Sequence, residues 1–543
     1  MADSLPGPAL MPERVYTLPA LRYPLQLNVG EQLLDANADG DRAGRPAVIA
    51  GDETLTYGEL AARVNRLCHG LRSLGLDAGD RVLLRLPNVP EFVVAWLACQ
   101  KLGLVTVGTM PMLRARELAY IVEDAGTRAA IVWGALRDEL ERAQAQSPVL
   151  ERLVVAGPSR RGDTTLAELM SSQPARCAAV ATGRDDMAMI AYTSGSTGVP
   201  KGCVHFQRDI LASADSYARH VLAPTPEDRF GGHPTLAFTF GTGGLLVFPL
   251  RFGAATVLSG PFTPESMLES FARQRVTIAF CAPTSYRFML DVPDMARRYD
   301  LGALRIGVSA AEPLPAATWE SWRKATGVEL LDGIGSTEMF HIFVSSLPGR
   351  VKPGATGLPV PGYDCRVVDE DGREVTPGTE GLIAIKGPTG CKYWRKPDRQ
   401  AEYVRFGGWN VTGDVYVQDA DGYLTYQCRS DDMIVSGGYK IPGPEVEHVL
   451  DEHPAVAESA VVAAPDPARG FVVKAFVVLK APAVPSAGLV GELQDHVKRE
   501  LAPYKYPRAI QFVERLPRTE TGKIQRYRLR LSDVLPWDER SRD

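Results

Sequence analysis

The sequence has few of the features that mark zinc-binding, disulfide-stabilised or secreted proteins. No two of its cysteines form a C-x-x-C pair, and no cluster of histidine and cysteine has the spacing of zinc ligands. Residues 1–15 lack a basic region followed by an apolar one, which argues against a signal peptide and favours a cytoplasmic protein. We expect free thiols in a reducing compartment at Cys68, Cys99, Cys177, Cys203, Cys281, Cys365, Cys391 and Cys428.

Long apolar runs and an excess of basic residues are also missing. A membrane-spanning helix needs roughly 18 or more apolar residues with few charges. The stretch 92–107 comes closest, but it contains Gln100 and Lys101, so a helix followed by a buried strand explains it better. The formal net charge of −5 is unlike that of a nucleic-acid-binding protein. We expect no nucleic acid and no membrane as partners, although a local basic pocket can still bind a polyanion.

The composition is that of an ordinary globular protein. A chain of 543 residues is too long for one hydrophobic core and long enough for two or three domains. With 45% hydrophobic and 23% charged residues, a disordered or fibrous protein is excluded. Strand-like and helix-like segments alternate up to about residue 330, which favours parallel sheets covered by helices.

Local signals refine this picture. The first ~25 residues are rich in proline and predict an arm. A hairpin is expected before residue 56, followed by a helix whose start carries a capping box, with Thr56 as the cap and Glu59 three residues later. Short strands separated by turn residues predict a small β-rich subdomain over about 355–427.

The predicted fold class is α/β. We expect a large N-terminal domain, residues 1–430, made of helix-covered and mostly parallel sheets together with the β-rich subdomain. A small α+β C-terminal domain, residues 431–543, should follow. The boundary is placed in the polar stretch 428–432.

The strongest local motif is YTSGSTGVPKG at 192–202, which directly follows an apolar stretch. Its glycines let backbone N–H groups approach phosphate oxygens, and its hydroxyls can donate to them. The spacing is neither that of a Walker A loop nor G-x-G-x-x-G. A flexible Ser/Gly linker is the alternative, but linkers rarely follow a buried strand and end in Pro-Lys-Gly. The predicted phosphate loop comprises Thr193, Ser194, Gly195, Ser196, Thr197, Gly198 and Lys201.

This loop resembles that of the adenylate-forming superfamily, which contains acyl- and aryl-CoA ligases, luciferases and nonribosomal adenylation domains. Further segments resemble, in the same order, its second nucleotide motif, its ribose motif, its hinge and thioester-tunnel motif, and its C-terminal lysine loop. They are GIGSTE (333–338), VTGD (411–414), RSDDMIVSGGYKIPGPEVE (429–447) and LPRTETGKIQR (516–526). Five motifs in the order that the family requires leave little room for coincidence.

The resemblance implies a two-step reaction with ATP, Mg²⁺ and coenzyme A. A carboxylate first attacks the α-phosphorus of ATP, and the CoA thiol then displaces AMP. Two unit charges about 4 Å apart repel by ~4 kcal/mol at an effective dielectric near 20, so the site must supply positive charge and donors. The resemblance implies three catalytic residues. Thr337 contacts the α-phosphate, Glu338 binds Mg²⁺ together with Thr197, and Lys523 bridges the carboxylate and the α-phosphate.

For the nucleoside, the resemblance implies that Asp414 accepts hydrogen bonds from the ribose hydroxyls and that Arg429 adds a second contact. The adenine slot is implied at 309–313, including Ser309, Ala310, Ala311 and Glu312, together with Asp332, Gly333 and Ile334, while Gly335 and Ser336 are implied nucleotide contacts of the second motif. A plain turn at the end of a strand is the alternative for 309–313.

For the second step, the resemblance implies that the C-terminal domain swings about Asp431. Gly437, Gly438 and Tyr439 would then line the pantetheine tunnel, where glycine lets a narrow chain run along the backbone. Residues 504–508 are a candidate for the CoA phosphate, and an ordinary solvated basic stretch explains them equally well.

The acid-binding pocket is expected to have flat, aromatic walls. Residues 332–343 resemble benzoate–CoA ligases, and the segments 18–29 and 108–119 resemble 2-aminobenzoate–CoA ligases. The predicted contacts are Phe238, Thr239, Phe240, Gly241, Phe280, Ala310, Ile334, His341 and Ile342. Phe240 departs from the tyrosine of benzoate ligases. Phenylalanines of a plain core and a structural histidine are the alternatives. The leading substrate is 2-aminobenzoate (anthranilate), followed by benzoate or a hydroxylated benzoate.

Two other functions compete with this one. A free-standing enzyme could load aryl acids onto a carrier protein. A module selecting α-amino acids is disfavoured, because it normally has an aspartate where Thr239 stands. A non-catalytic relative is disfavoured by the presence of Lys523, Glu338 and Asp414. We expect a monomer or a homodimer.

Overall fold

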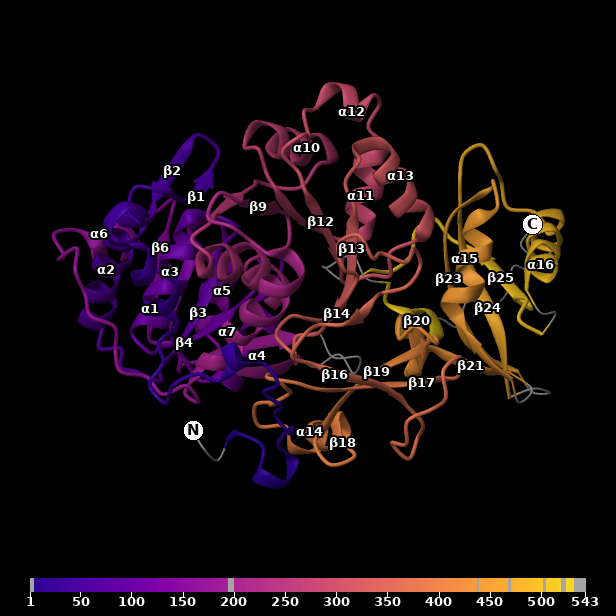
Figure 1. Cartoon of the computed structure of the whole chain (residues 1–543), viewed down its shortest axis with the longest axis horizontal. Helices are drawn as coiled ribbons and strands as arrows, with labels where there is room; N and C mark the ends of the chain where they lie inside the picture. The colour runs from indigo at the N-terminus through magenta and orange to yellow at the C-terminus, as the bar shows by residue number, and fades with distance from the viewer. Residues whose placement is uncertain are drawn as a thin grey trace. The chain divides into compact units, whose positions relative to one another are not determined.

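The computed structural model describes residues 4–193, 200–436, 439–466, 470–501, 504–518 and 524–531. The chain divides into two compact units (Figure 1). The first unit comprises Met1–Arg366, Ala384–Val411 and Gly422–Leu424, and the second comprises Val367–Ile383, Thr412–Asp421 and Thr425–Asp543. Within the described part of the chain, no helix is both long and apolar enough to span a membrane. All eight cysteines lie in described segments and are free thiols, as predicted.

The first unit contains a six-stranded sheet that carries the predicted phosphate loop. The strand order is β6-β5-β3-β4-β7-β8, parallel except for the final hairpin of β7 and β8. The strands are β3 (Arg81–Arg85), β4 (Val105–Gly108), β5 (Thr127–Trp133), β6 (Arg152–Ala156), β7 (Met187–Thr193) and β8 (Lys201–Phe206). Helix α3 (Pro90–Lys101) precedes β4, which confirms the predicted helix and buried strand. Helices α4 (Ala115–Ala125) and α5 (Arg137–Gln144) pack on the sheet through a shared apolar core.

A nine-stranded sheet is the other large element of the first unit. Its order is β15-β14-β13-β12-β11-β9-β10-β1-β2, parallel through the centre and antiparallel towards both edges. The strands are β1 (Pro46–Ala50), β2 (Glu53–Thr56), β9 (Arg229–Gly232), β10 (Ala255–Leu258), β11 (Ile278–Cys281), β12 (Ile306–Ala310), β13 (Leu330–Gly335), β14 (Ile342–Ser345) and β15 (Leu358–Pro359).

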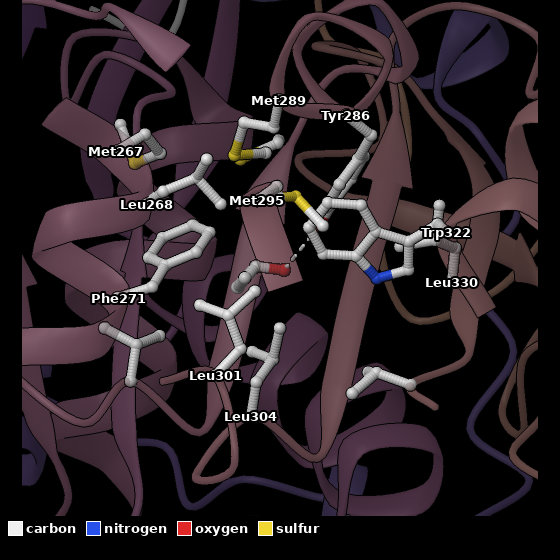
Figure 2. Packing of buried hydrophobic residues seen from close by; sticks show 14 of the residues in the cluster. Met267, Leu268, Phe271, Tyr286, Met289, Met295, Leu301, Leu304, Trp322 and Leu330 are labelled. Carbon is white, nitrogen blue, oxygen red and sulfur yellow. Dashed lines mark hydrogen bonds between the residues drawn. The ribbon is translucent and has the colours of Figure 1, made fainter. Parts of the chain in front are cut away.

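Helices α10 (Pro264–Arg273), α11 (Pro283–Leu290), α12 (Met295–Arg298) and α13 (Ala316–Thr326) cover one part of this sheet. Figure 2 shows the core between them, where Met267 and Phe271 face Tyr286 and Trp322. The rings of Tyr286 and Trp322 meet edge to face, with centroids 4.8 Å apart. Fully burying one large apolar side chain stabilises a fold by roughly 1.5–3 kcal/mol, so this cluster fixes the strands beneath it.

The remaining helical segments of the first unit include the one with the predicted cap. Helix α2 (Tyr57–Ser73) begins after Thr56, whose hydroxyl accepts a hydrogen bond from the Glu59 N–H, while the Glu59 carboxylate accepts one from the Thr56 N–H. The capping box is thus confirmed. The other segments are α1 (Val29–Leu33), α6 (Leu166–Met170), α7 (Gln207–Ser213), α8 (Thr239–Thr242), α9 (Phe248–Arg251), α14 (Pro397–Tyr403) and two π-helical segments, η7 (Ala214–Leu222) and η8 (Gly243–Val247).

The N-terminal arm is fixed to the first unit by a buried ion cluster. The arm forms the short 3₁₀ turns η2 (Pro8–Leu10) and η3 (Pro19–Leu21). Between them, Arg14 lies 3.3 Å from Asp209, and Lys392 lies 2.9 Å from the same carboxylate. Burial alone would raise the pKa of Asp209, but the charges of Arg14 and Lys392 outweigh it and hold that pKa below its ordinary value. The cluster therefore ties three distant segments together.

The predicted β-rich subdomain is present as a five-stranded sheet. Its strands are β16 (Asp364–Val368), β17 (Glu380–Lys386), β18 (Val404–Arg405), β19 (Trp409–Gln418) and β20 (Leu424–Arg429). The division between the two units falls within β16, β17, β19 and β20, because each strand runs from residues of one unit to residues of the other. The domain boundary expected at 430/431 lies inside the second unit, and as a functional boundary it stays a prediction.

The C-terminal part of the second unit is α+β, as expected. A three-stranded sheet has the order β23-β24-β25, and β21 pairs with β22 in a separate hairpin. The elements are β21 (Met433–Ser436), β22 (Tyr439–Pro442), α15 (Gly443–Glu452), β23 (Val456–Asp466), β24 (Gly470–Leu479), α16 (Ala487–Glu500), β25 (Ala509–Phe512) and α17 (Arg526–Leu531). Val446, Leu450, Val461, Val473 and Leu493 share its apolar core.

Candidate functional site

The candidate site lies where the central strands of the nine-stranded sheet end. Strands β11, β12 and β13 are parallel, so their carboxyl ends meet at one edge, the usual place for ligands in α/β sheets. The register pairs Ser309 with Asp332 and Ala310 with Gly333. The two predicted halves of the adenine slot, 309–313 and 332–334, are therefore brought side by side.

The turn after β12 has an unusual backbone. Ala311 has a φ of 78°, a left-handed conformation that costs an alanine about 1 kcal/mol or more. The hydroxyl of Thr284 donates to the Glu312 carboxylate over 2.6 Å and holds the turn against helix α11. Backbone strain of this kind gathers at ligand sites, which favours a binding role over a plain turn.

Two tyrosines support the second predicted nucleotide motif. The Tyr393 hydroxyl donates to Glu338 Oε1 over 2.6 Å, and the Tyr403 hydroxyl lies 3.2 Å from Ser336 Oγ. The Nζ of Lys201 lies 5.0 Å from the centre of the Tyr393 ring. Burial, and then the charge of Glu338, raise the pKa of Tyr393, so its hydroxyl stays protonated and donates. The first and second motifs thus meet at one side chain.

Glu338 and its neighbours fit a magnesium site of the usual kind. Mg²⁺ is commonly held by one or two protein carboxylates together with phosphate oxygens and water. Within the residues that the structure describes, no group of three or more acidic, histidine or cysteine side chains could hold a metal by itself. A single carboxylate suits a metal that arrives with a phosphate ligand.

Asp332 is a buried acid with no cation beside it among the residues that the structure describes. Burial raises its pKa to about 8, and hydrogen bonds from the backbone of Gly333 and Leu314 offset only part of this effect. Its Oδ1 has no hydrogen-bond partner among the described residues. At neutral pH the carboxyl is therefore mostly protonated and can donate a hydrogen bond.

An aromatic cluster surrounds His341 and brings together much of the predicted acid pocket. The His341 ring centre lies 4.6 Å from that of Phe248, 5.6 Å from Phe240, 6.2 Å from Phe280 and 5.5 Å from Tyr217. Phe248 and Tyr217 were not predicted. Phe280 and Ile342 are buried, while Phe238, Phe240 and Ile334 are partly exposed.

His341 is neutral, because burial lowers its pKa to about 3. Its Nε2 lies 3.4 Å from the carbonyl oxygen of Phe240. If this long contact is the N–H donor, Nδ1 is left as an acceptor, and among the described residues it has no partner.

Glycines let this cluster pack closely against the segment 239–251. A Cβ at Gly243 would lie 2.4 Å from His341 Cδ2, and one at Gly244 would lie 2.6 Å from Phe280 Cδ1. At the predicted contact Gly241, a Cβ would lie 2.0 Å from the carbonyl oxygen of Thr235. Gly243 and Gly244 begin the π-helical segment η8, and such segments are frequent at functional sites.

The predicted ribose contacts lie together in the second unit. Arg429 Nη1 donates to the Thr412 carbonyl over 2.6 Å and lies 3.3 Å from Asp414 Oδ1. Glu447 forms a two-point ion pair with Arg526, which belongs to the last predicted motif. These contacts place three of the predicted motifs within one unit.

Some of the remaining predicted residues lie in described segments, and the others lie outside them. Thr193 and Lys201 pair at the loop end of the β7–β8 hairpin, so they flank the predicted phosphate loop. Asp431 belongs to the 3₁₀ turn η9 (Ser430–Asp432) and Tyr439 to β22. Outside the described residues lie Ser194, Gly195, Ser196, Thr197, Gly198, Gly437, Gly438 and Lys523.

The burial of Asp332 predicts a pH-dependent stability. Its folded pKa of about 8 exceeds the ordinary value of about 4, so folding takes up a proton. Between these values the free energy of unfolding should fall by up to ~1.4 kcal/mol per pH unit as the pH rises. Asp332→Asn should flatten the Tm profile between pH 5 and 8 and raise Tm at pH 8. Glu320→Gln, at an exposed site, is the control; profiles of equal slope would contradict the assignment.

Comparisons with known proteins agree with this geometry. The AMP-binding enzyme family matches residues 34–394, and the AMP-binding enzyme C-terminal domain matches 445–523. Benzoate–CoA ligase of Thauera aromatica is 40% identical over 95% of this chain and 98% of its own length. A 4-hydroxybenzoate–CoA/benzoate–CoA ligase of Rhodopseudomonas palustris is 34% identical over 93% and 94%.

Solved structures give the same picture. An anthranilate–CoA ligase in complex with anthranoyl-AMP has a TM-score of 0.88 at 37% identity, covering 95% of this chain and 99% of that one. A benzoate–CoA ligase from Burkholderia xenovorans has a TM-score of 0.84 at 37% identity, covering 93% and 99%. With its aromatic cluster beside the carboxyl ends of parallel strands and these similarities along nearly its whole length, the chain belongs to the AMP-binding enzyme family.

Proposed function

We propose that this aryl acid–CoA ligase activates 2-aminobenzoate, with benzoate as the next candidate substrate. The observation that carries the proposal is the aromatic cluster of Phe240, Phe248, Phe280 and His341 beside the carboxyl ends of β11 to β13. A cluster of flat apolar rings can form a wall against which a planar acid packs. The similarity to an anthranilate–CoA ligase and to benzoate–CoA ligases supports the same substrate class.

The surroundings of His341 favour an amino group on the ring of the acid. In the tautomer that donates to the Phe240 carbonyl, Nδ1 is an acceptor without a partner among the described residues. The amino group of 2-aminobenzoate offers an N–H donor, whereas benzoate offers none at that position. A buried acceptor left without a donor costs about 1–3 kcal/mol, so 2-aminobenzoate should be preferred over benzoate.

In the proposed first step, the carboxylate of the aryl acid attacks the α-phosphorus of ATP and pyrophosphate leaves. Lys201 and the adjoining loop bind the phosphates, and Thr337 contacts the α-phosphate. Glu338 would hold Mg²⁺, which neutralises phosphate charge when it is bound. Asp414 and Arg429 bind the ribose, and Lys523 stabilises the charge that moves onto the phosphate in the transition state.

In the proposed second step, the thiolate of CoA attacks the acyl carbon and AMP leaves with its bonding electrons. Gly437, Gly438 and Tyr439 form the tunnel for the pantetheine arm, after a rotation about Asp431. The acceptor is CoA; a carrier protein is the alternative. A cytoplasmic location and a monomeric or dimeric state belong to the same proposal.

A product assay tests the reaction and the substrate together. Purified protein is given ATP, Mg²⁺ and CoA with 2-aminobenzoate, benzoate, 2-hydroxybenzoate, 4-hydroxybenzoate, cinnamate or octanoate, and thioesters are identified by mass spectrometry. We expect 2-aminobenzoyl-CoA to dominate, with kcat/KM at least about fivefold above that for benzoate. Preference for octanoate would refute the pocket assignment. AMP release without any thioester would favour a carrier protein. Lys523→Ala should lose adenylation yet still convert supplied aryl-AMP.

The hydroxyl of Tyr393 should position Glu338. Tyr393→Phe keeps the ring beside Lys201 but removes the hydrogen bond to the carboxylate. Hydrogen bonds to charged groups contribute about 1.5–3 kcal/mol, so KM for ATP and the Mg²⁺ concentration for half-maximal rate should rise roughly tenfold. KM for the aryl acid should stay unchanged. Magnesium titrations of the initial rate provide the measurement, with Tyr299→Phe as the control; an equal rise in the KM of both substrates would mean a general structural effect.

The close approach at Gly244 should set the size of the acid pocket. In Gly244→Ala the new methyl group would lie 2.6 Å from Phe280, so the ring must shift. Overpacking costs about 1–3 kcal/mol, which predicts a five- to hundredfold loss of kcat/KM for the aryl acid. KM for ATP should change little. Gly260→Ala, where a Cβ meets nothing within 4 Å, is the matched control. Unchanged aryl-acid kinetics in Gly244→Ala would contradict the assignment.

A further inference from the structure

A pair of cysteines outside the candidate site lies where the segment 175–177 runs along helix α2. Asn65, Cys68, His69 and Arg72 occupy one face of this helix, because residues three and four apart are neighbours. Asn65 donates to the carbonyl of Ala175 over 2.9 Å, and His69 Nε2 lies 2.9 Å from the carbonyl oxygen of Arg176. Two adjacent hydrogen bonds thus fix the backbone that carries Cys177.

The thiols of Cys68 and Cys177 lie close enough for each to shift the pKa of the other. Cys68 is fully buried in α2 and also lies 3.7 Å from the carbonyl oxygen of Ala98. Cys177 is partly exposed, and Arg72 Nη1 lies 3.4 Å from its sulfur. The other cysteines of the chain are all buried. The pair therefore combines an accessible sulfur with a shielded one behind it.

The surroundings favour the thiolate of Cys177. The nearby Cys68 thiol, followed by the charges of Arg72 and His69 on the same helix and of Lys101 on α3, lowers the pKa of Cys177 and outweighs the effect of its partial burial. Cys68 shows the opposite shift, because the nearby Cys177 and its own burial both raise its pKa. A partly exposed thiolate beside a guanidinium group is the usual setting of a reactive cysteine.

We propose that Cys177 and Cys68 form a peroxide-reactive thiol pair, with Cys177 as the attacking sulfur and Cys68 as the resolving one. The Cys177 thiolate attacks one oxygen of a hydroperoxide, so an S–O bond forms, the O–O bond breaks and hydroxide (or alkoxide) takes up a proton and leaves. The Cys68 thiol then attacks the sulfur of this sulfenic acid. An S–S bond forms, the S–O bond breaks and water leaves, so two electrons pass from the thiols to the peroxide.

The disulfide would connect α2 to the segment that leads into strand β7. Residues 178–186 join Cys177 to β7, whose last residue, Thr193, begins the predicted phosphate loop. Val180 and Thr182 of this segment are hydrogen-bonded to Asn28 and Leu27, so the whole connection is held against the first unit. The modification needs no ligand of the proposed function, and its test does not depend on ligase activity.

The test uses the full-length native protein and dilute hydrogen peroxide. After alkylation of free thiols, digestion without reductant and mass spectrometry, we expect a cross-linked peptide pair of Cys68 and Cys177 that a dithiol reductant separates. Cys68→Ala should stop at a sulfenic acid on Cys177 that dimedone captures, and Cys177→Ala should leave Cys68 reduced. Random pairing of the eight cysteines, or oxidation at Cys68 first, would overturn the proposal.

A second measurement keeps the proposal testable if a cysteine variant folds poorly. With a limiting amount of iodoacetamide at pH 7, Cys177 should be alkylated first in the native protein. Arg72→Met should slow this alkylation about three- to tenfold, because the thiolate loses its guanidinium partner. Arg63→Met, also on α2, is the control. Equal rates in both variants, or reaction of Cys177 only after unfolding, would contradict the assignment.

Discussion

The parallel pairing of β12 with β13 is the constraint on which the candidate site depends. Because parallel strands in register end at the same edge, Ser309 lies opposite Asp332 and the loops that follow must share one place. The strained turn at Ala311 and the motif around Glu338 both start from that edge. The register itself is fixed by the apolar core of α10, α11 and α13, so packing away from the candidate site determines where its loops lie.

Two tyrosines from later in the chain hold the motif that follows β13. Tyr393 precedes helix α14, Tyr403 ends it, and both hydrogen-bond to the second motif, which lies more than fifty residues earlier in the sequence. The ring of Tyr393 also lies beside Lys201, at the end of the first motif. One phenol therefore contacts a cation through its face and an anion through its hydroxyl. This dual contact can hold both nucleotide motifs in place before a nucleotide arrives.

Short-range patterns explain which features the sequence could predict. The capping box at Thr56 and Glu59 depends on residues three apart, and it is found as expected. Phe240, Phe280 and His341 were all predicted to line the acid pocket, and their rings do meet. Tyr217, Phe248 and the two supporting tyrosines were missed, because a ring contact between distant segments leaves no spacing signal. The buried charge of Asp209 was missed for the same reason, since its partners come from both ends of the first unit.

The glycines beside the aromatic cluster also decide how this pocket could be redesigned. At 243 and 244 the backbone already touches the rings of His341 and Phe280, so any added carbon on that side removes space. A library meant to admit bulkier acids should therefore vary the rings and leave these glycines unchanged. Bulkier acids would then be admitted by replacing a ring with a smaller side chain, while the glycine side of the pocket keeps its shape.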